Sequence, residues 1–418
     1  MSEVQLFIFH RDLRIVDHYG LEECSKRKIP VLPVFIFTPE QVMKNPLKSN
    51  NSVQFMLQSL KELNVQLRQK GTRLIMLYGD SVKMLESLKK ELNIVAITET
   101  KDYTPYAKKR EKSIKEFCDK NDIEHTLVHD IYLTTPGSIR TGGDKVFQKF
   151  TPYYEVARKV KIPKPNGISN SSWYKPKSSA YENEISINEA YKKFLVGLNP
   201  NIAVKGGRIE ALHLLKHLPI DYDKIRDCLA KKTSMMSAHN HFGTVSIREV
   251  YHAAKELSPT KMEGYIRQLF WRDFNGALMD YFEELYHEAP YEFEGKATLR
   301  GKTDEAAKKK FELWKKGETG HDLVDAGIKQ LLTTGFMHNR TRMVVASYLV
   351  KDCHVYWRWG EQFFAKHLVD YDPAQNMMNW AGTSSLAPFG SAPFRRHDPE
   401  VTEKRLDPTH EYVEKWLE

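Results

Sequence analysis

The stretch Val4-Gln5-Leu6-Phe7-Ile8-Phe9 is short and almost wholly apolar. Such a run suits a strand of a parallel sheet that is covered on both faces. Similar runs follow at Val31–Phe37, Leu74–Tyr78 and Ile94–Thr98, and helical patterns separate them at Ser52–Lys70, Ser81–Leu92 and Pro105–Lys120. This alternation predicts an α/β domain, a doubly wound parallel sheet with right-handed crossovers.

The character of the sequence changes after residue 130. Residues 131–202 are rich in glycine, proline, serine and asparagine, which is typical of a long connection. Helical patterns dominate from residue 203: a capping box at Ser246 and Glu249, a helix from Ser258 to about Leu285, and helices at Asp325–Leu332 and Arg342–Val350. We expect an α/β domain over 1–130, a connection over 131–202 and an all-helical domain over 203–418.

Composition excludes several classes of protein. With 41% hydrophobic and 28% charged residues, the chain of 418 residues is globular. No apolar run approaches the roughly 18 residues of a membrane span, and the N-terminus does not resemble a signal peptide. Four widely spaced cysteines form neither a disulfide framework nor a zinc motif, which fits a reducing compartment. The net charge of +9 favours a polyanionic partner such as nucleic acid, although ordinary solubility also explains it.

One segment concentrates polar groups at a helix start. Asp372 precedes Pro373, a pattern typical of a helix N-terminus, and Asn376 lies one turn further along the same face. Asp370 lies just before this start and Trp380 one turn after Asn376. Two carboxylates, an amide and an indole suit the binding of a polar heterocycle, but a capped surface helix explains the same pattern.

Two further segments carry candidate chemistry. The segment from Lys231 to Ser237 places two lysines and three hydroxyl groups near a helix start, which suits a phosphate, although a simple N-cap is the default explanation. In the segment around His338, Arg340 and Arg342 need carboxylate partners if they are buried, and Asp370 or Asp372 could supply them. His338 itself is more typical of a satisfied core histidine than of a catalyst.

Several motifs, in sequence order, resemble the DNA photolyase/cryptochrome family. They are His10-Arg11-Asp12-Leu13-Arg14, Phe150-Thr151-Pro152-Tyr153, Leu269-Phe270-Trp271-Arg272-Asp273-Phe274, Met337-His338-Asn339-Arg340-Thr341-Arg342-Met343, Trp357-Arg358-Trp359-Gly360-Glu361 and Asp370-Tyr371-Asp372-Pro373-Ala374-Gln375-Asn376. The resemblance runs from about residue 4 to Leu417 and is greatest to a class I-type cyclobutane pyrimidine dimer photolyase with a shortened chain. It implies a U-shaped FAD in the helical domain.

The resemblance also implies which residues hold FAD. Its phosphates would meet Thr233, Ser234 and Ser237, with Lys231 or Lys232 replacing the arginine that the family has at Met235. The remaining cofactor residues implied by the motifs are Tyr222, Arg272, Asn339, Arg342, Asp370, Asp372 and Asn376.

Asn376 carries the functional distinction that the resemblance implies. In the family this position faces flavin N5, where an amide goes with repair enzymes, while plant cryptochromes have Asp and animal ones Cys. The chain also ends at Glu418 without a signalling tail. We therefore expect a light-dependent DNA repair enzyme, a lyase that splits cyclobutane pyrimidine dimers by electron donation from excited reduced FAD. A (6-4) photoproduct photolyase and a blue-light receptor are the alternatives.

The resemblance assigns the lesion pocket to Gln268, Trp271, Arg340 and Met343. Gln268 stands where dimer photolyases have Glu, and Gln here also occurs in (6-4) enzymes; Asn339 stands where those enzymes have His. Trp380 is either the electron donor next to the flavin or a second pocket wall.

The family's tryptophan relay predicts Trp380 and Trp357 as its first two members. The third position falls at Asp304, so Trp359, Tyr356 or another tyrosine is a candidate exit. A pterin or deazaflavin antenna would lie near Arg11 and residues 99–106. We expect UV-damaged DNA as partner, a monomer, no metal and no membrane, in the cytoplasm or wherever the DNA is, including a nucleus.

Overall fold

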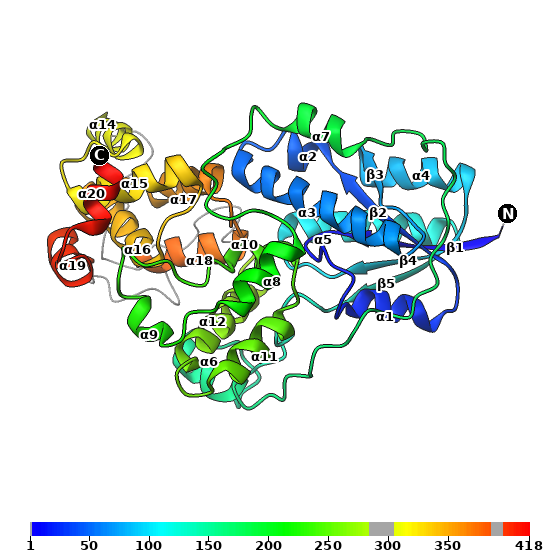
Figure 1. Ribbon diagram of the computed structural model, residues 1–418, viewed down its shortest axis with the longest axis horizontal. Helices are drawn as coiled ribbons and strands as arrows, with labels where there is room; N and C mark the ends of the chain where they lie inside the picture. Colours follow the sequence, from blue (N-terminus) through cyan, green and yellow to red (C-terminus); the bar gives the residue numbers. More distant parts are fainter. Residues whose placement is uncertain (1, 284–304, 386–395) are drawn as a thin grey trace.

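The computed structural model describes residues 2–283, 305–385 and 396–418, and it places a parallel sheet beside a helical domain (Figure 1). The strands are β1 (Glu3–Phe9), β2 (Val31–Phe37), β3 (Ile75–Tyr78), β4 (Asn93–Thr100) and β5 (Glu124–Val128). The helices before residue 203 are α1 (Tyr19–Lys26), α2 (Pro39–Val42), α3 (Asn50–Gln69), α4 (Ser81–Glu91), α5 (Pro105–Lys120), α6 (Phe150–Ala157) and α7 (Ile187–Phe194).

The helical domain follows in the second half of the chain. Its elements are α8 (Arg208–Lys216), α9 (Tyr222–Ile225), α10 (Ser237–Phe242), α11 (Ile247–Leu257), α12 (Glu263–Tyr281), α14 (Glu305–Lys316), α15 (Asp322–Thr334), α16 (Asn339–Ser347), the π-helix η1 (Tyr348–Asp352), α17 (Trp357–His367), α18 (Pro373–Thr383), α19 (Pro399–Leu406) and α20 (Glu411–Leu417).

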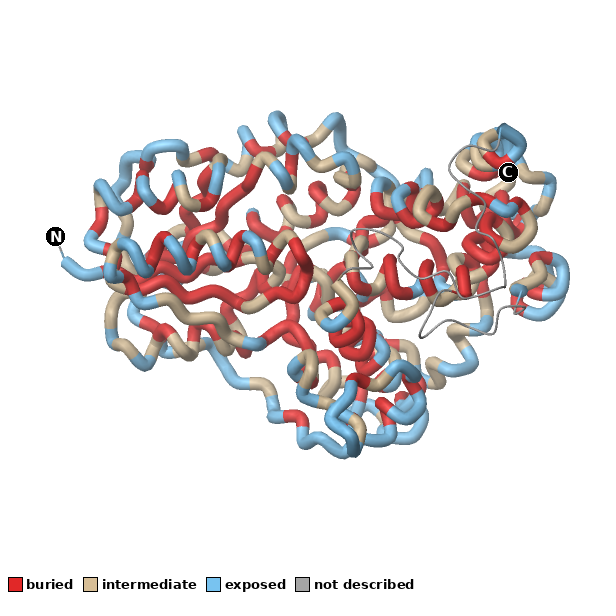
Figure 2. Tube along the Cα trace, turned by 180° about the vertical axis from the view of Figure 1, so that it is seen from behind, coloured by how far each residue is buried: buried red, intermediate tan, exposed pale blue. Residues whose placement is uncertain are grey.

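The sheet confirms the predicted doubly wound α/β domain. Its strand order is β3-β2-β1-β4-β5, and every neighbouring pair is parallel. The chain therefore winds outward from β1 in both directions. Every residue of β2 is buried, as are Val4–Phe9 of β1, and Figure 2 shows buried segments running through this domain. These are the runs that the sequence predicts as strands covered on both faces.

Three elements of this domain escape prediction from the sequence: β5, α1 and the four-residue helix α2. Strand β5 pairs only with β4, so it lies at the sheet edge, and its residues are exposed or half-buried. An edge strand needs no continuous apolar run, and Glu-His-Thr-Leu-Val has none. Helix α1 buries only three of its eight residues and gives a correspondingly weak pattern.

The helical half follows the sequence with shifted boundaries. The capping box at Ser246 and Glu249 is present at the start of α11. The helix expected from Ser258 begins instead at Glu263, because the residues between them form a turn in which the Lys261 N–H donates to Ser258 Oγ (3.3 Å). The predicted connection also contains helices α6 and α7.

The two domains share a hydrophobic interface. The core cluster that contains Phe9 of β1 and Phe55 of α3 also includes Phe242 and Val369 from the helical domain. The Leu13 N–H, just after β1, donates to the Phe242 carbonyl (3.0 Å). The segment after β1 therefore lies directly against the helical domain.

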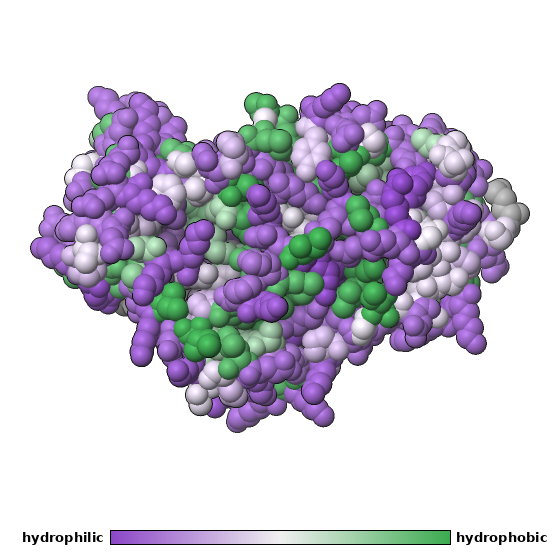
Figure 3. Space-filling view, viewed as in Figure 1, coloured by the Kyte–Doolittle hydropathy of each residue, from purple (hydrophilic) through white to green (hydrophobic). Residues whose placement is uncertain are grey.

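The molecular surface is mostly hydrophilic on the face shown in Figure 3, with hydrophobic side chains gathered near its middle. Ile209 and Leu212 of α8, which lies there, are 74% and 41% exposed. No helix in the described part of the chain is long and apolar enough to cross a membrane.

Candidate functional site

Asp372 caps helix α18, as the sequence predicts. Its carboxylate accepts hydrogen bonds from the N–H groups of Ala374 (3.0 Å) and Gln375 (3.2 Å). Arg11 Nη2 lies 3.0 Å and His241 Nδ1 3.1 Å from the same carboxylate. Burial opposes ionisation, but Arg11 and the His241 hydrogen bond hold the pKa of Asp372 below its usual range. Asp372 is thus a constant anion whose partners are protein groups.

Asn376 lies one turn further along α18 and is held by Glu361 of α17. Its Nδ2 donates to the Glu361 backbone carbonyl (3.0 Å) and to Glu361 Oε1 (2.8 Å). Because a carbonyl can only accept, the amide nitrogen must face Glu361, and the Asn376 oxygen is presented on the opposite side. Burial raises the pKa of the Glu361 carboxyl, while Arg358 and Asn376 oppose that rise.

Arg342 of α16 takes Asp370 as its carboxylate partner, one of the two that the sequence offers. Its Nη2 lies 3.1 Å and 2.9 Å from the two carboxylate oxygens. Its Nε donates to the Met337 carbonyl (2.8 Å), and the guanidinium lies 5.2 Å from the Phe336 ring centroid. This arrangement fixes a guanidinium–carboxylate pair just before the start of α18.

The segment before α10 forms an anion-binding turn. Met235 has a left-handed backbone (φ 54°), and Met236 follows with a right-handed one (φ −84°, ψ −5°). Consecutive residues of opposite hand point their N–H groups into one concavity, which binds anions. Ser237 begins α10 directly after this turn, while Lys231 and Lys232 are exposed. The turn matches the predicted phosphate segment, which includes Thr233 and Ser234.

The other predicted cofactor residues lie in varied surroundings. Arg272 of α12 is buried, donates to the carbonyls of Ile131 and Asn240, and lies over the Tyr132 ring. Tyr222 begins α9 and is half-buried, whereas Asn339 at the start of α16 is exposed.

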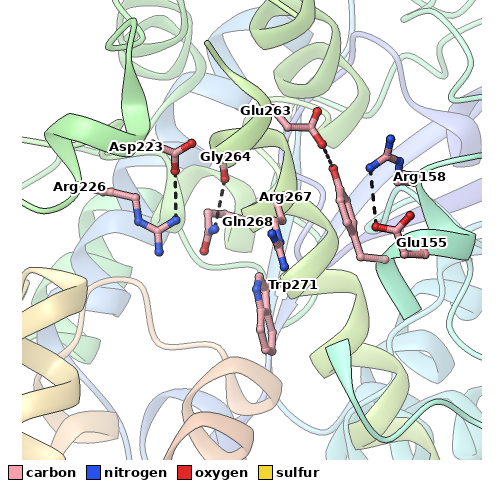
Figure 4. A pocket seen from close by; sticks show the side chains of 10 residues that line it. Glu155, Arg158, Asp223, Arg226, Glu263, Gly264, Arg267, Gln268 and Trp271 are labelled. Atoms are coloured by element: carbon pink, nitrogen blue, oxygen red, sulfur yellow. Dashed lines mark hydrogen bonds and ion pairs between the residues drawn. The ribbon is translucent and has the colours of Figure 1, made fainter. Parts of the chain in front are cut away.

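A cavity of about 510 Å³ opens beside α12 (Figure 4). Two predicted lesion residues, Gln268 and Trp271, belong to its lining. Three arginines and three carboxylates also belong to the lining. The lining residues are Tyr154, Glu155, Arg158, Asp223, Arg226, Glu263, Gly264, Arg267, Gln268 and Trp271.

The predicted lesion residues are brought together only in part. Trp271 is 37% exposed, and its other face stacks on Phe150 with ring centroids 3.8 Å apart. Gln268 Nε2 donates to the Gly264 carbonyl (3.2 Å), which leaves the amide oxygen as an acceptor (Figure 4). Arg340 pairs instead with Asp227 (2.6 Å). Neither Arg340 nor Met343 belongs to the cavity lining.

The tryptophans of the helical core form a separate group. Trp380 is buried and does not line the cavity that holds Trp271. Its ring would overlap any side chain at position 360, so Gly360 of α17 lets it approach that helix closely. Trp357 is buried, whereas Trp359 is only partly buried. Asp304 lies outside the described residues.

Two of the residues predicted near an antenna, Arg11 and Glu99, form ion pairs with other side chains of the protein. Arg11 lies 3.6 Å from Asp102 as well as 3.0 Å from Asp372. Glu99 is buried between His10 (2.7 Å) and His125 (2.8 Å).

The helical domain fits a bound FAD. Over the described ranges, Asn240 Oδ1 and His338 Nε2 are buried without a hydrogen-bond partner, and the Asn376 oxygen is presented away from Glu361. The anion-binding turn before α10 suits phosphates. Glu361 and His241, which hold Asn376 and Asp372, are the site residues that the sequence reasoning missed. The one signal in the sequence was for Glu361, a carboxylate inside the Trp357–Glu361 motif, and no quoted motif contains His241.

Comparison with known proteins agrees with this fit. Residues 265–418 match the FAD-binding domain of DNA photolyase, and residues 5–168 match the DNA photolyase domain. The deoxyribodipyrimidine photo-lyase of Streptomyces griseus is 32% identical over 438 aligned positions, covering 99% of this chain and 89% of that protein.

Solved structures give the same result. The archaeal photolyase from Sulfolobus tokodaii, solved with two FAD molecules, has a TM-score of 0.85 at 34% identity and covers 100% of this chain and 90% of its own. A bacterial class III photolyase from Agrobacterium tumefaciens has a TM-score of 0.88 at 26% identity, covering 100% and 86%.

Fold and site together define a two-domain flavoprotein whose helical domain binds FAD. The chain belongs to the DNA photolyase/cryptochrome family. Its class within the family stays a prediction. In the described part of the chain, no group of three or more His, Cys, Asp or Glu side chains could hold a metal ion.

Proposed function

We propose that the chain is a light-dependent DNA repair enzyme that splits cyclobutane pyrimidine dimers. The observation that carries the proposal is the buried Asn376 amide, which Glu361 orients and which cannot titrate. An amide at this position goes with repair in the family that the sequence resembles. Similarity to deoxyribodipyrimidine photo-lyases over nearly the whole chain supports the same activity.

When bound, FAD supplies the electron that light makes available for ring splitting. The residues around FAD would bind it and fix its orientation. The turn before α10 would hold phosphate oxygens with its N–H groups. The Arg342–Asp370 ion pair fixes the position of a guanidinium, and the Asn376 oxygen would accept a hydrogen bond from the bound cofactor without changing its own protonation.

The cavity beside α12 would receive the damaged bases. Extruding a lesion from the duplex costs a few kcal/mol, less where pairing is already damaged. Stacking on an aromatic ring returns about 1–3 kcal/mol per base, and the exposed face of Trp271 offers such a ring. Because Gln268 Nε2 is held by Gly264, its oxygen is the atom available to accept a pyrimidine N–H.

A (6-4) photoproduct is the second candidate substrate, favoured by Gln268 in place of Glu. Illumination of the FAD-loaded, reduced protein with oligonucleotides that carry one lesion of either kind tests both. Restored pyrimidines from the dimer in light, and none in darkness, are expected. Repair of the (6-4) lesion alone would replace the first proposal by the second. If neither lesion is repaired, the remaining alternative is a blue-light receptor without repair activity.

For the antenna, the S. tokodaii photolyase with its two FAD molecules adds a second flavin to pterin and deazaflavin as candidates for this chain. We propose that the chain acts as a monomer on UV-damaged DNA, in the cytoplasm or wherever that DNA is. Mass spectrometry of the extracted chromophores identifies the antenna, and light scattering of the holoprotein tests whether it is a monomer.

A further inference from the structure

Helix α8 carries two histidines one turn apart at the surface of the protein (Figure 1). His213 lies in its last turn and His217 ends it, and both are exposed. Ala211 is the one buried residue among the nine of this fully described helix. Residues four apart on a helix are neighbours on the same face. The two imidazole rings accordingly lie together, with centroids 4.5 Å apart and planes at 41°.

A backbone contact determines which nitrogen of His217 can bind a metal ion. His217 Nδ1 lies 2.7 Å from the carbonyl oxygen of His213. Because a carbonyl only accepts, Nδ1 carries the proton, and the neutral ring keeps its lone pair on Nε2. Proteins commonly orient a metal-binding histidine in this way, with the second nitrogen donating to a backbone carbonyl. Among the described residues, no hydrogen bond or ion pair engages the ring nitrogens of His213.

The separation of the two rings suits a single metal ion. A metal–nitrogen bond of about 2.0–2.1 Å places the centroid of each imidazole about 3.2 Å from the ion. Two such rings at a right angle around the ion have centroids about 4.5 Å apart, whereas a tetrahedral angle needs about 5.2 Å. The observed 4.5 Å therefore fits neighbouring positions of a square-planar, tetragonal or octahedral ion.

The surroundings favour a cation that prefers nitrogen ligands. The last carbonyl groups of a helix carry a partial negative charge, and His217 stands at that end of α8. The ammonium of Lys216, the neighbouring residue, is exposed and its repulsion is therefore screened by water. Imidazole suits Cu²⁺ and Ni²⁺, while Mg²⁺ and Ca²⁺ prefer oxygen. The described residues offer no third ligand, so water would fill the remaining positions.

We propose that His213 and His217 bind one late first-row divalent metal ion, Cu²⁺ or Ni²⁺, through one ring nitrogen each. The ion joins the two side chains across the last turn of α8 and keeps exchangeable water ligands. The site lies outside the segments assigned to FAD and outside the cavity beside α12. It is therefore independent of the proposed repair activity.

Binding would stabilise a helix that contacts both domains. The N–H of Gly207, the residue before α8, donates to Ser59 Oγ of α3 in the α/β domain (3.0 Å). Arg208, the first residue of α8, pairs with Glu249 of α11 in the helical domain (2.6 Å). An ion that binds only the folded protein stabilises it by mass action.

The test titrates the FAD-loaded, oxidised protein, purified without a histidine tag, in the dark at slightly alkaline pH. Calorimetry with Ni²⁺ gives affinity and stoichiometry, and pulsed electron paramagnetic resonance with Cu²⁺ counts the coordinated imidazoles. One ion per chain and two imidazoles are expected. His213→Gln and His217→Gln should each weaken binding about 100-fold, because the second ligand acts intramolecularly. The matched control is His354→Gln, at an exposed histidine with Val350 and Arg358 one turn away, which should bind as the wild type does.

Unchanged affinity in either α8 variant, a single imidazole in the wild type, or one ion per two chains would overturn the proposal. Mg²⁺ binding with the same affinity as Ni²⁺ would do so too. The flavin absorbance of each variant checks that it folds and holds FAD. Light-dependent repair, measured without added metal, should be equal in all variants. Its absence in the wild type would contradict the proposed function and leave the metal site standing.

Discussion

Replacing Asn376 by Asp tests whether the Asn376–Glu361 contact organises the flavin site. Asn376 Nδ2 donates both to the Glu361 carbonyl (3.0 Å) and to its carboxylate (2.8 Å), and both side chains are buried. Asn376→Asp keeps the shape of the side chain but removes both donated hydrogens. It also places a second carboxyl against the first.

The structure sets the scale of the effect. A buried acceptor without its donor costs about 1–3 kcal/mol. Two carboxylates about 3 Å apart repel by roughly 5–6 kcal/mol at an effective dielectric constant of about 20, so one of them keeps its proton at neutral pH. That proton restores one hydrogen bond. The expected net loss of stability is about 2–4 kcal/mol near neutral pH.

The loss should depend on pH in one direction. Burial already raises the pKa of Glu361 in the wild type, and the second carboxyl raises the pKa of the pair further. An acid whose pKa is higher in the folded than in the unfolded protein stabilises the fold fully at pH values below its pKa in the unfolded protein. This stabilisation is lost as the pH rises through its pKa in the folded protein. Asn376→Asp should therefore approach wild-type stability in acid and lose it towards alkaline pH.

Thermal unfolding of the FAD-saturated protein at about pH 5 and about pH 8 measures this dependence. Since 1 kcal/mol shifts Tm by about 2–4 °C in a domain of 150–250 residues, a fall of roughly 5–15 °C is expected at the higher pH. The matched control is Asn379→Asp, an exposed position on the same helix. Equal Tm values for Asn376→Asp and wild type at both pH values, with an unaltered flavin redox cycle, would refute the reasoning.

Three other substitutions separate the parts of the site. Trp271→Ala should weaken binding of dimer-containing DNA by about 1–3 kcal/mol, or about 5- to 150-fold, and leave undamaged DNA unaffected in a titration. Gln268→Glu introduces a carboxyl group, which in a free glutamate side chain has a pKa of about 4.3, so the repair rate should gain an acid limb that the wild-type pH profile lacks. Arg11→Ala leaves the Asp372 carboxylate buried without its guanidinium partner and should lower the free energy of unfolding, measured in urea, by about 3–5 kcal/mol. The control is Arg27→Ala, which removes a pair with an exposed carboxylate and should lower it by about 1 kcal/mol or less.

The sequence predicts those features whose cause is local. Strands β1 to β4 are found because burial on both faces demands continuous apolar runs, and β5 is missed because an edge strand does not. The Asp372 cap follows from two adjacent residues. Charge alone reduces the carboxylate partner of Arg342 to two candidates, Asp370 and Asp372, and the structure shows Asp370.

Contacts between distant segments lie beyond such reasoning. Arg11 and Asp372 are separated by 361 positions, and Trp314 contacts Trp380 from another helix. Nothing in either segment's own pattern requires the other. The family motifs predict the cofactor residues, but they do not reveal that Glu361 orients Asn376 or that Arg358 lies over the Trp357 ring.

The Arg11 contacts connect the α/β domain with the segment that the sequence predicts to hold the flavin. Arg11 leaves the end of β1, meets Asp102 just after β4, and reaches Asp372 at the start of α18. Without it, the capping carboxylate of α18 would keep its two backbone N–H donors, but its one remaining ion-pair partner among the described residues would be His241, and burial lowers the pKa of that imidazole. The helix that presents Asn376 therefore depends on the sheet domain for charge balance. This dependence gives the α/β domain a role in the helical site whether or not it also holds an antenna.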